Sequence, residues 1–205
     1  MNNLITLSPA ATQEKMPLLI ALHGNLSNAE AELTQWRPAL SAGWLLAMPQ
    51  STRTDEDGKF IWNRPGANEW PVEEIQTHYT NLLKQYPIDL GRVVLGGFSM
   101  GVGLAAWMAL HGFIKARGFI MASPYLPYKY VEAPEMDIVI SNQLRGYVIA
   151  GELDEPTFGW SGKFVDRVRK NNIPCEHATY PNMDHEYPPD FNQVLLNALN
   201  FIINP

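Results

Sequence analysis

Ser99 lies between two glycines, in the segment Gly97-Phe98-Ser99-Met100-Gly101. An apolar run at 92–96 precedes this segment and helix-forming residues follow it, which predicts a strand, a tight turn and a helix. In that context Gly-x-Ser-x-Gly is typical of a nucleophile elbow, in which the serine Oγ is exposed at the tip of the turn. Glycine suits positions 97 and 101, because a side chain there would collide with the neighbouring strand or helix. We therefore interpret Ser99 as a candidate nucleophile.

A serine hydroxyl is a weak nucleophile at neutral pH, so a nearby base must accept its proton. His185 can act as that base, because an imidazole gains and loses a proton near neutral pH. A carboxylate that holds the imidazole in one tautomer completes such a set, and Asp154 is the leading candidate. We interpret Glu152 and Glu155 as solvated neighbours of Asp154. The sequence thus predicts a Ser-His-Asp triad.

Other aspartates and histidines of the chain are alternatives to the residues of this triad. Asp184 adjoins His185 in the sequence, which makes a bond between the two side chains awkward, and Asp137 stays open as an alternative acid. His23 precedes a glycine and is interpreted as a structural, hydrogen-bonding histidine. The remaining histidines lie within or beside expected regular elements and do not form a metal set: His78, His111 and His177.

Apolar segments of strand length alternate along the chain with segments of helix length. Strands are expected at 4–7, 16–22, 44–48, 92–96, 117–122, 147–150 and 176–180, and helices at 71–86, 100–110, 157–170 and 190–203. A further helix should start at Ser27, which has capping-box spacing to Glu30. The alternation predicts an α/β fold with a mostly parallel sheet of about six to seven strands and helices on both faces. Ser99, Asp154 and His185 each follow an expected strand, and ligand sites lie at the carboxyl ends of such strands.

Composition argues against several function classes. The formal charge of −6 leaves no basic surface for nucleic acid. No run of 18 apolar residues exists, so no membrane span is expected. The first residues do not resemble a signal peptide and the single cysteine, Cys175, allows no internal disulfide, so we expect a cytoplasmic protein. The length of 205 residues predicts one domain over 1–205.

Four motifs together resemble the phospholipase/carboxylesterase family of small α/β-hydrolases, which includes acyl-protein thioesterases. These motifs are His23-Gly24-Asn25, Gly97-Phe98-Ser99-Met100-Gly101, Gly151-Glu152-Leu153-Asp154 and Met183-Asp184-His185. The resemblance implies an α/β-hydrolase fold, cleavage of carboxylic esters or thioesters without a metal or organic cofactor, and oxyanion-hole amides from Asn25 and Met100. The family usually reads His-Gly-x-Gly-Asp, whereas this chain has Leu26 and Ser27 in place of the second glycine and the acid.

We therefore expect a serine hydrolase that acts on a small-molecule ester or thioester. The polar segment 50–69 is long enough to be functional, and Trp62 and Phe158 are predicted to form walls of the acyl pocket. No insertion is long enough for a lid domain, so an open site for short to medium acyl chains is expected. The same triad would serve an acyltransferase or a peptidase, and a non-catalytic binding protein of the same fold is the alternative from another class. The oligomeric state is not predicted.

Overall fold

A computed structural model describes residues 3–9, 14–64, 70–125, 141–155 and 157–204. In chain order its elements are β1 (Leu4–Leu7), β2 (Met16–Leu22), α1 (Ala29–Trp36), the 3₁₀ helix η1 (Arg37–Ala42), β3 (Leu45–Pro49), α2 (Val72–Gln85), β4 (Ile88–Ser99), α3 (Met100–Leu110), β5 (Gly118–Pro124), β6 (Arg145–Gly151), α5 (Thr157–Lys170), β7 (Cys175–Tyr180) and α6 (Phe191–Ile203). The predicted alternation of strands and helices is confirmed.

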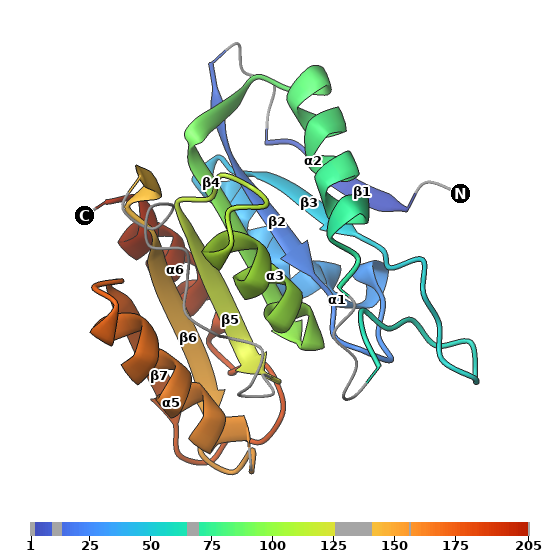
Figure 1. The fold of residues 1–205 in the computed structure, drawn as a ribbon. Coiled ribbons are helices and arrows are strands. Elements are labelled where there is room, and N and C mark those ends of the chain that lie inside the picture. Colours follow the sequence, from blue (N-terminus) through green and yellow to red (C-terminus); the bar gives the residue numbers. More distant parts are fainter. Residues whose placement is uncertain (1–2, 10–13, 65–69, 126–140, 156, 205) are drawn as a thin grey trace.

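The strands form one twisted sheet in the order β1-β3-β2-β4-β5-β6-β7 (Figure 1). All neighbouring strands are parallel except β1, which runs antiparallel to β3 at one edge. β4 lies near the middle and pairs with β2 on one side and β5 on the other. The prediction of a mostly parallel sheet of six to seven strands is therefore confirmed, and the carboxyl ends of β2, β4, β6 and β7 meet at one edge.

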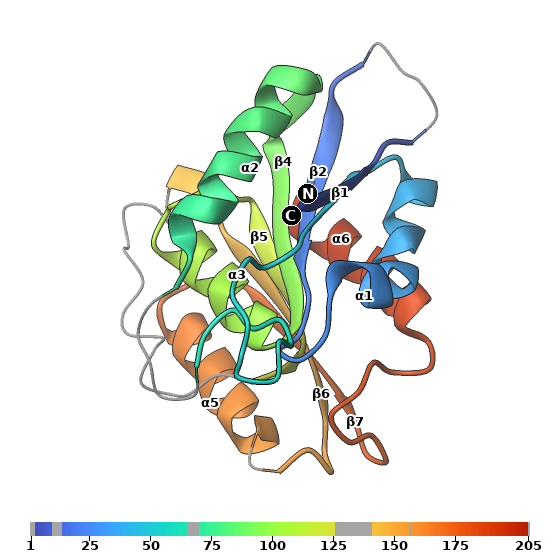
Figure 2. The same cartoon turned by 90° about the vertical axis from the view of Figure 1, so that its right-hand side faces the viewer.

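Helices cover both faces of the sheet (Figure 2). α2, α3 and α5 contribute side chains to the apolar core on one face, and α1, η1 and α6 contribute to the core on the other. Burial on both faces explains why β2 and β3 are apolar along their whole length.

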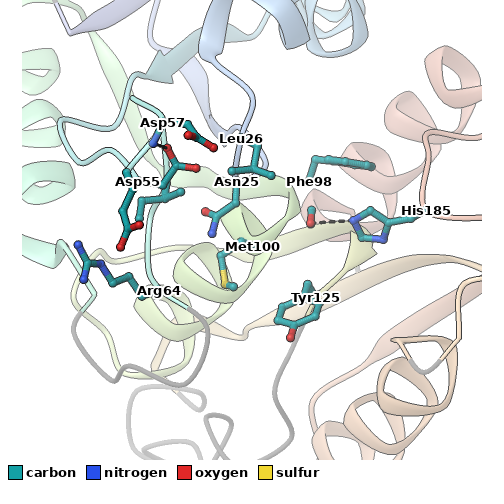
Figure 3. Close-up of a pocket in the computed structure, with 12 residues that line it drawn as sticks. Asn25, Leu26, Asp55, Asp57, Arg64, Phe98, Met100, Tyr125 and His185 are labelled. Carbon is teal, nitrogen blue, oxygen red and sulfur yellow. Dashed lines mark hydrogen bonds between the residues drawn. The ribbon is translucent and has the colours of Figure 1, made fainter. Parts of the chain in front are cut away.

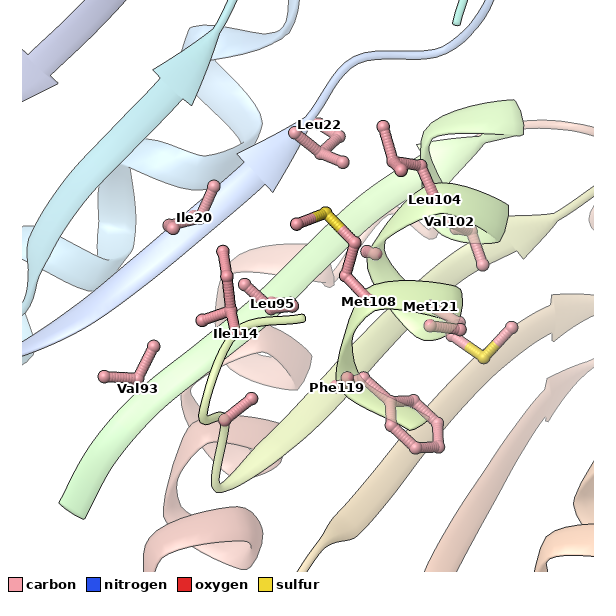
Figure 4. Packing of buried hydrophobic residues seen from close by; sticks show 14 of the residues in the cluster. Ile20, Leu22, Val93, Leu95, Val102, Leu104, Met108, Ile114, Phe119 and Met121 are labelled. Atoms are coloured by element: carbon pink, nitrogen blue, oxygen red, sulfur yellow. The ribbon is translucent and has the colours of Figure 1, made fainter. Parts of the chain in front are cut away.

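Helix α3 lies close against the sheet. Every residue of α3 except Trp107 is buried, and its glycines and alanines leave room for large side chains from the strands. Figure 4 shows Leu104 and Met108 of α3 on the side of the sheet that also bears Leu22 and Leu95, and all four belong to the same apolar cluster. This packing holds the start of α3, and with it the turn that carries Ser99, firmly on the sheet.

Helix α1 begins one residue later than the predicted capping box. Its N-cap is Asn28, whose side chain accepts a hydrogen bond of 2.8 Å from the amide of Ala31. The side chain of Ser27 is not the cap, so the capping-box prediction is wrong in detail although the helix is present. Asparagine and serine cap helices about equally well, which explains why sequence spacing alone selected the wrong residue.

Neither a lid domain nor a membrane-spanning helix is found in the part of the chain that the structure describes. No separate lid domain lies over the carboxyl edge of the sheet. None of the helices in the described ranges has the length and apolar character needed to cross a bilayer.

Candidate active site

Ser99 sits at the tip of a sharp turn between β4 and α3. Its backbone has φ 51° and ψ −119°, a conformation that side-chain-bearing residues rarely adopt and that is associated with functional sites. The turn is possible because Gly97 and Gly101 have no side chains. A Cβ on Gly97 would lie 2.8 Å from the carbonyl carbon of Gly101, and one on Gly101 would lie 2.5 Å from the carbonyl oxygen of Leu22. The strand, turn and helix predicted around Ser99 are present.

The structure brings Ser99, His185 and Asp154 together. His185 Nε2 lies 2.7 Å from Ser99 Oγ, and His185 Nδ1 lies 2.7 Å from Asp154 Oδ2 (the first contact is dashed in Figure 3). A carboxylate oxygen can only accept, so Nδ1 carries the proton and Nε2 is free to accept the serine proton. This is the tautomer that a serine nucleophile needs.

Asp154 follows β6 in a turn that begins helix α5. It is 7% exposed, and its backbone carbonyl accepts hydrogen bonds from the Thr157 hydroxyl (2.6 Å) and the Phe158 amide (2.8 Å). The turn crosses closely under the loop that carries the histidine, because a Cβ on Gly151 would lie 2.1 Å from the carbonyl oxygen of Met183. The glycine and the carbonyl bonds hold the backbone of this turn, and the Asp154 carboxylate contacts His185 Nδ1.

His185 lies in the loop between β7 and α6. The hydroxyl of Ser123, at the carboxyl end of β5, donates to the carbonyl of Glu186 (2.6 Å) and so ties this loop to the sheet. The His185 ring also lies 5.2 Å from the ring of Phe98, the residue before the nucleophile. The backbone bond at Glu186 and the ring contact with Phe98 help to hold His185 between Ser99 and Asp154.

The alternative acids have other positions. The Asp184 carboxylate accepts a hydrogen bond from the backbone amide of His185 (2.8 Å), so it supports the backbone of the loop. Glu152 and Glu155 are exposed, as expected for solvated neighbours. Asp137 lies outside the described residues.

Asn25 and Met100, whose amides are predicted to form an oxyanion hole, both line the cavity beside Ser99. Met100 is the first residue of α3, so its amide has no carbonyl partner within the helix. In the loop after β2, the amide of Gly24 donates to Glu32 and that of Leu26 donates to the carbonyl of Phe60 (2.7 Å). No described residue accepts the amide between them, that of Asn25. The structure thus leaves the amides of Asn25 and Met100 free beside Ser99.

The loop after β2 keeps a bent backbone without the second glycine of the family motif. Leu26 occupies that position and has φ 66°, in the left-handed region that favours glycine. The side chain of Asn25 compensates: it accepts from the amide of Trp62 (2.8 Å) and donates to the carbonyl of Asn63 (2.9 Å). The polar segment after β3 therefore holds this loop in place.

The prediction that Trp62 forms a wall of the pocket is wrong. Its side chain is fully buried, and its indole Nε1 donates to the carbonyl of His23 (2.6 Å). A buried indole N–H needs an acceptor, and this one finds it beneath the loop rather than beside the substrate. Trp62 supports the loop from below and does not line the cavity.

Phe158 does not form a wall of the pocket either. It lies on α5 with its ring 6.3 Å from the ring of His177, and it is absent from the lining of the cavity beside Ser99. Phe158 lies one turn after Asp154 on the face of α5 that packs against β7, so its ring points toward that strand. This second prediction for the pocket is also wrong.

The cavity beside Ser99 has a volume of about 750 Å³ and opens to solvent. Its walls near the serine are apolar, and charged side chains lie at the end away from His185 (Figure 3). Sequence reasoning did not find most of these residues, although several follow the carboxyl ends of β2, β3 and β5, which was the available signal. The described lining residues are Asn25, Leu26, Asp55, Glu56, Asp57, Ile61, Arg64, Phe98, Ser99, Met100, Tyr125 and His185.

His23 is the structural histidine that the sequence predicted. It is fully buried, and its Nδ1 donates to the carbonyl of Gly24 (2.7 Å). Its Nε2 accepts from the amide of Ser51 (3.2 Å) and the side-chain amide of Gln50 (3.2 Å). Burial lowers the pKa of His23 from 6.5 to about 4, so the ring is neutral and serves as a fixed support under the loop.

The chain is similar in structure to several solved proteins. No protein-family profile and no curated protein matches the chain. Solved structures do match. An uncharacterized protein of Bacillus cereus ATCC 10987 superposes with a TM-score of 0.80 and 29% identity over 96% of this chain. The chain spans 62% of the length of that protein.

Other solved structures carry names. A Bacillus cereus carboxylesterase matches with a TM-score of 0.77 and 14% identity, covering 97% of this chain and 93% of its own. A Zea mays acyl-protein thioesterase 2 matches with a TM-score of 0.69 and 17% identity, covering 98% of this chain and 99% of its own. The fold is that of the α/β-hydrolases. The predicted fold is therefore confirmed, and its structural neighbours include the kinds of esterase and thioesterase that the sequence motifs resemble.

Proposed function

We propose that this α/β-hydrolase-fold protein is a serine hydrolase that cleaves carboxylic esters or thioesters with short to medium acyl chains. The observation that carries the proposal is the placement of His185 at 2.7 Å from both Ser99 Oγ and Asp154 Oδ2, at the edge of an open cavity. A merely structural serine would not need a strained backbone, an imidazole within hydrogen-bond distance and a cavity at the same atom. The named esterases and thioesterase among the structural neighbours support it.

The first half of the reaction forms an acyl-enzyme. Ser99 Oγ attacks the carbonyl carbon while its proton passes to His185 Nε2, and the carbonyl oxygen becomes an oxyanion. The free amides of Asn25 and Met100 donate to that oxyanion, and Asp154 stabilises the imidazolium through Nδ1. When the intermediate collapses, the bond to the leaving oxygen or sulfur breaks and His185 returns the proton to it. The alcohol or thiol leaves, and the acyl group stays on Ser99.

The second half releases the acid. Water takes the position of the leaving group, His185 Nε2 accepts its proton, and the resulting hydroxide attacks the acyl carbon. Collapse of this second intermediate returns the proton to Ser99 Oγ and frees the carboxylic acid. The apolar cavity wall formed by Leu26, Ile61 and Phe98 suits the acyl chain, and its open mouth limits the length that is enclosed.

A panel of p-nitrophenyl esters and matching thioesters, from two to sixteen carbons, tests the proposal. We expect kcat/KM to be highest for short to medium chains, and Ser99→Ala to lower it by at least about 10⁴-fold while the protein stays folded. Ser41→Ala is the matched control, because Ser41 is exposed on η1 and its hydroxyl donates to the carbonyl of Pro38 in its own helix. Turnover that survives in Ser99→Ala would refute the proposal.

A further inference from the structure

Glu32 on helix α1 is a buried acid that the triad does not use. It is 6% exposed, and each of its carboxylate oxygens has a partner. Oε1 accepts from the backbone amide of Gly24 (2.8 Å), and Oε2 accepts from the hydroxyl of Tyr187 (2.8 Å). The Ser27 side chain, in the same loop as Gly24, also bonds to Glu32. A carboxylate of low exposure is costly to bury, so the positions of Gly24 and Tyr187 indicate its role.

The two partners belong to the two loops that meet at Ser99. Gly24 directly precedes Asn25, whose amide is one of the free donors. Tyr187 follows His185 by two residues in the histidine loop. Glu32 therefore joins the loop after β2, called here the oxyanion loop, to the loop between β7 and α6, called the histidine loop. Glu32 and Tyr187 are 155 residues apart in the sequence.

Tyr187 also reaches the nucleophile elbow. Its ring stacks on Phe98 with 4.4 Å between centroids, and its hydroxyl accepts from Trp36 Nε1 (3.0 Å). Phe98 in turn lies beside His185 and directly precedes Ser99. Tyr187, held by the stacked ring and two hydrogen bonds, therefore links Glu32 to Phe98 in the elbow and to the loop that carries His185.

The contacts around Gly24 are equally close. A Cβ on Gly24 would lie 3.0 Å from Phe98 Cδ1, 3.3 Å from Ser99 Cβ and 3.5 Å from Glu32 Oε1. The backbone of the oxyanion loop is therefore in contact with the elbow itself. A small displacement of Gly24 would move the Asn25 amide relative to Ser99 Oγ.

The hydrogen bonds favour the ionised form of Glu32, since both the Gly24 amide and the Tyr187 hydroxyl act as donors to it. Burial nevertheless raises the pKa of Glu32, against the hydrogen bonds from Gly24, Tyr187 and Ser27, which lower it. The desolvation cost of the charge thus exceeds what these bonds return. A neutral side chain at this position would relieve that cost for folding.

We propose that Glu32 is a positioning residue for the reaction, which fixes the Asn25 amide relative to His185 by tying Gly24 to Tyr187. This inference rests on the proposed serine hydrolase function. It predicts an effect on the chemical steps, because the oxyanion exists only in the intermediates and transition states, and little effect on substrate binding. Misplacement of a catalytic group by a fraction of an ångström is enough to slow such steps.

Glu32→Gln separates positioning from folding. Its carbonyl oxygen replaces only one of the two carboxylate oxygens, and its NH₂ group can only donate, so the separate bonds from the Gly24 amide and the Tyr187 hydroxyl cannot both be accepted as before. We expect kcat for a p-nitrophenyl ester to fall tenfold or more, with KM within twofold of wild type. We expect Tm to stay level or rise, since the buried charge is gone. Glu30→Gln, at an exposed position on the same helix, should leave kcat, KM and Tm unchanged.

Tyr187→Phe and the double variant complete the test. Because both single variants break the same connection, their effects on kcat should not multiply in the double variant. The inference is overturned if Glu32→Gln matches Glu30→Gln in kcat, if KM changes as much as kcat, or if kcat falls only together with Tm. An inactive wild-type protein would instead overturn the proposed function, and with it the role of Glu32.

Discussion

Acid should destabilise this protein through His23, the buried histidine beneath the oxyanion loop. Its Nδ1 donates to the carbonyl of Gly24, and its Nε2 faces two groups that can only donate to it, the Ser51 amide and the Gln50 side-chain amide. A second proton on Nε2 would point at both donors inside a fully buried site. The folded protein therefore resists protonation of His23, whereas the unfolded chain does not.

The magnitude follows from the pKa of His23, which burial lowers from 6.5 to about 4. Because the folded pKa is depressed, the stability is fully present above pH 6.5 and is lost as pH falls toward 4. Each pH unit in this window removes about 1.4 kcal/mol from the free energy of unfolding. At pH 5 the loss from His23 alone is about 2 kcal/mol, and below pH 4 it levels off at about 3 kcal/mol.

Urea unfolding of wild type and His23→Gln at pH 7.5 and pH 5 measures this loss. The variant is less stable at both pH values, but its stability should fall by about 2 kcal/mol less between them than that of wild type. Groups other than His23 titrate in both proteins and cancel in the comparison. An equal fall in the two proteins would refute the reasoning, and so would an NMR titration in which the His23 ring takes up a proton near pH 6.5 in the folded state.

Two further predictions concern the turn and the triad. Asp154→Asn should keep the fold but lower kcat by about 10³–10⁴-fold, because an amide facing His185 Nδ1 no longer favours the tautomer with a free Nε2. Circular dichroism checks the fold and ester turnover checks kcat. A loss of kcat below tenfold would contradict this prediction. Gly101→Ala places a methyl 2.5 Å from the carbonyl oxygen of Leu22 and should lower the free energy of unfolding by about 1–3 kcal/mol or more. Gly162→Ala in α5 should instead raise it by up to about 1 kcal/mol, because the added Cβ meets no described atom within 4 Å apart from the adjoining backbone of its own helix. Equal shifts in urea midpoint for the two variants would contradict the steric argument.

The positions of the strands along the chain, and the residues that follow them, could be predicted from the sequence because these signals are local. An apolar run of strand length is buried wherever it lies, and the parallel arrangement then brings the residues after each run to one edge. This reasoning placed Ser99, Asp154 and His185 together. It did not predict the direction of a single large side chain, because that depends on where a polar atom finds a partner. Trp62 also lies in a segment that follows a strand, yet its side chain points inward because its indole N–H donates to the carbonyl of His23.

The loop after β2 departs from the family motif, and distant residues hold it in place. Leu26 and Ser27 stand where the family has a glycine and an acid. Contacts to the loop come from a carboxylate of Glu32, eight residues after Gly24, and from an indole of Trp62, 39 residues from its acceptor. Neither Glu32 nor Trp62 stands out in the sequence around it. Each contacts the loop after β2 only because the fold brings the segments together. If these contacts substitute for the motif, their loss should impair turnover as strongly as loss of the motif would, although none of them touches the substrate.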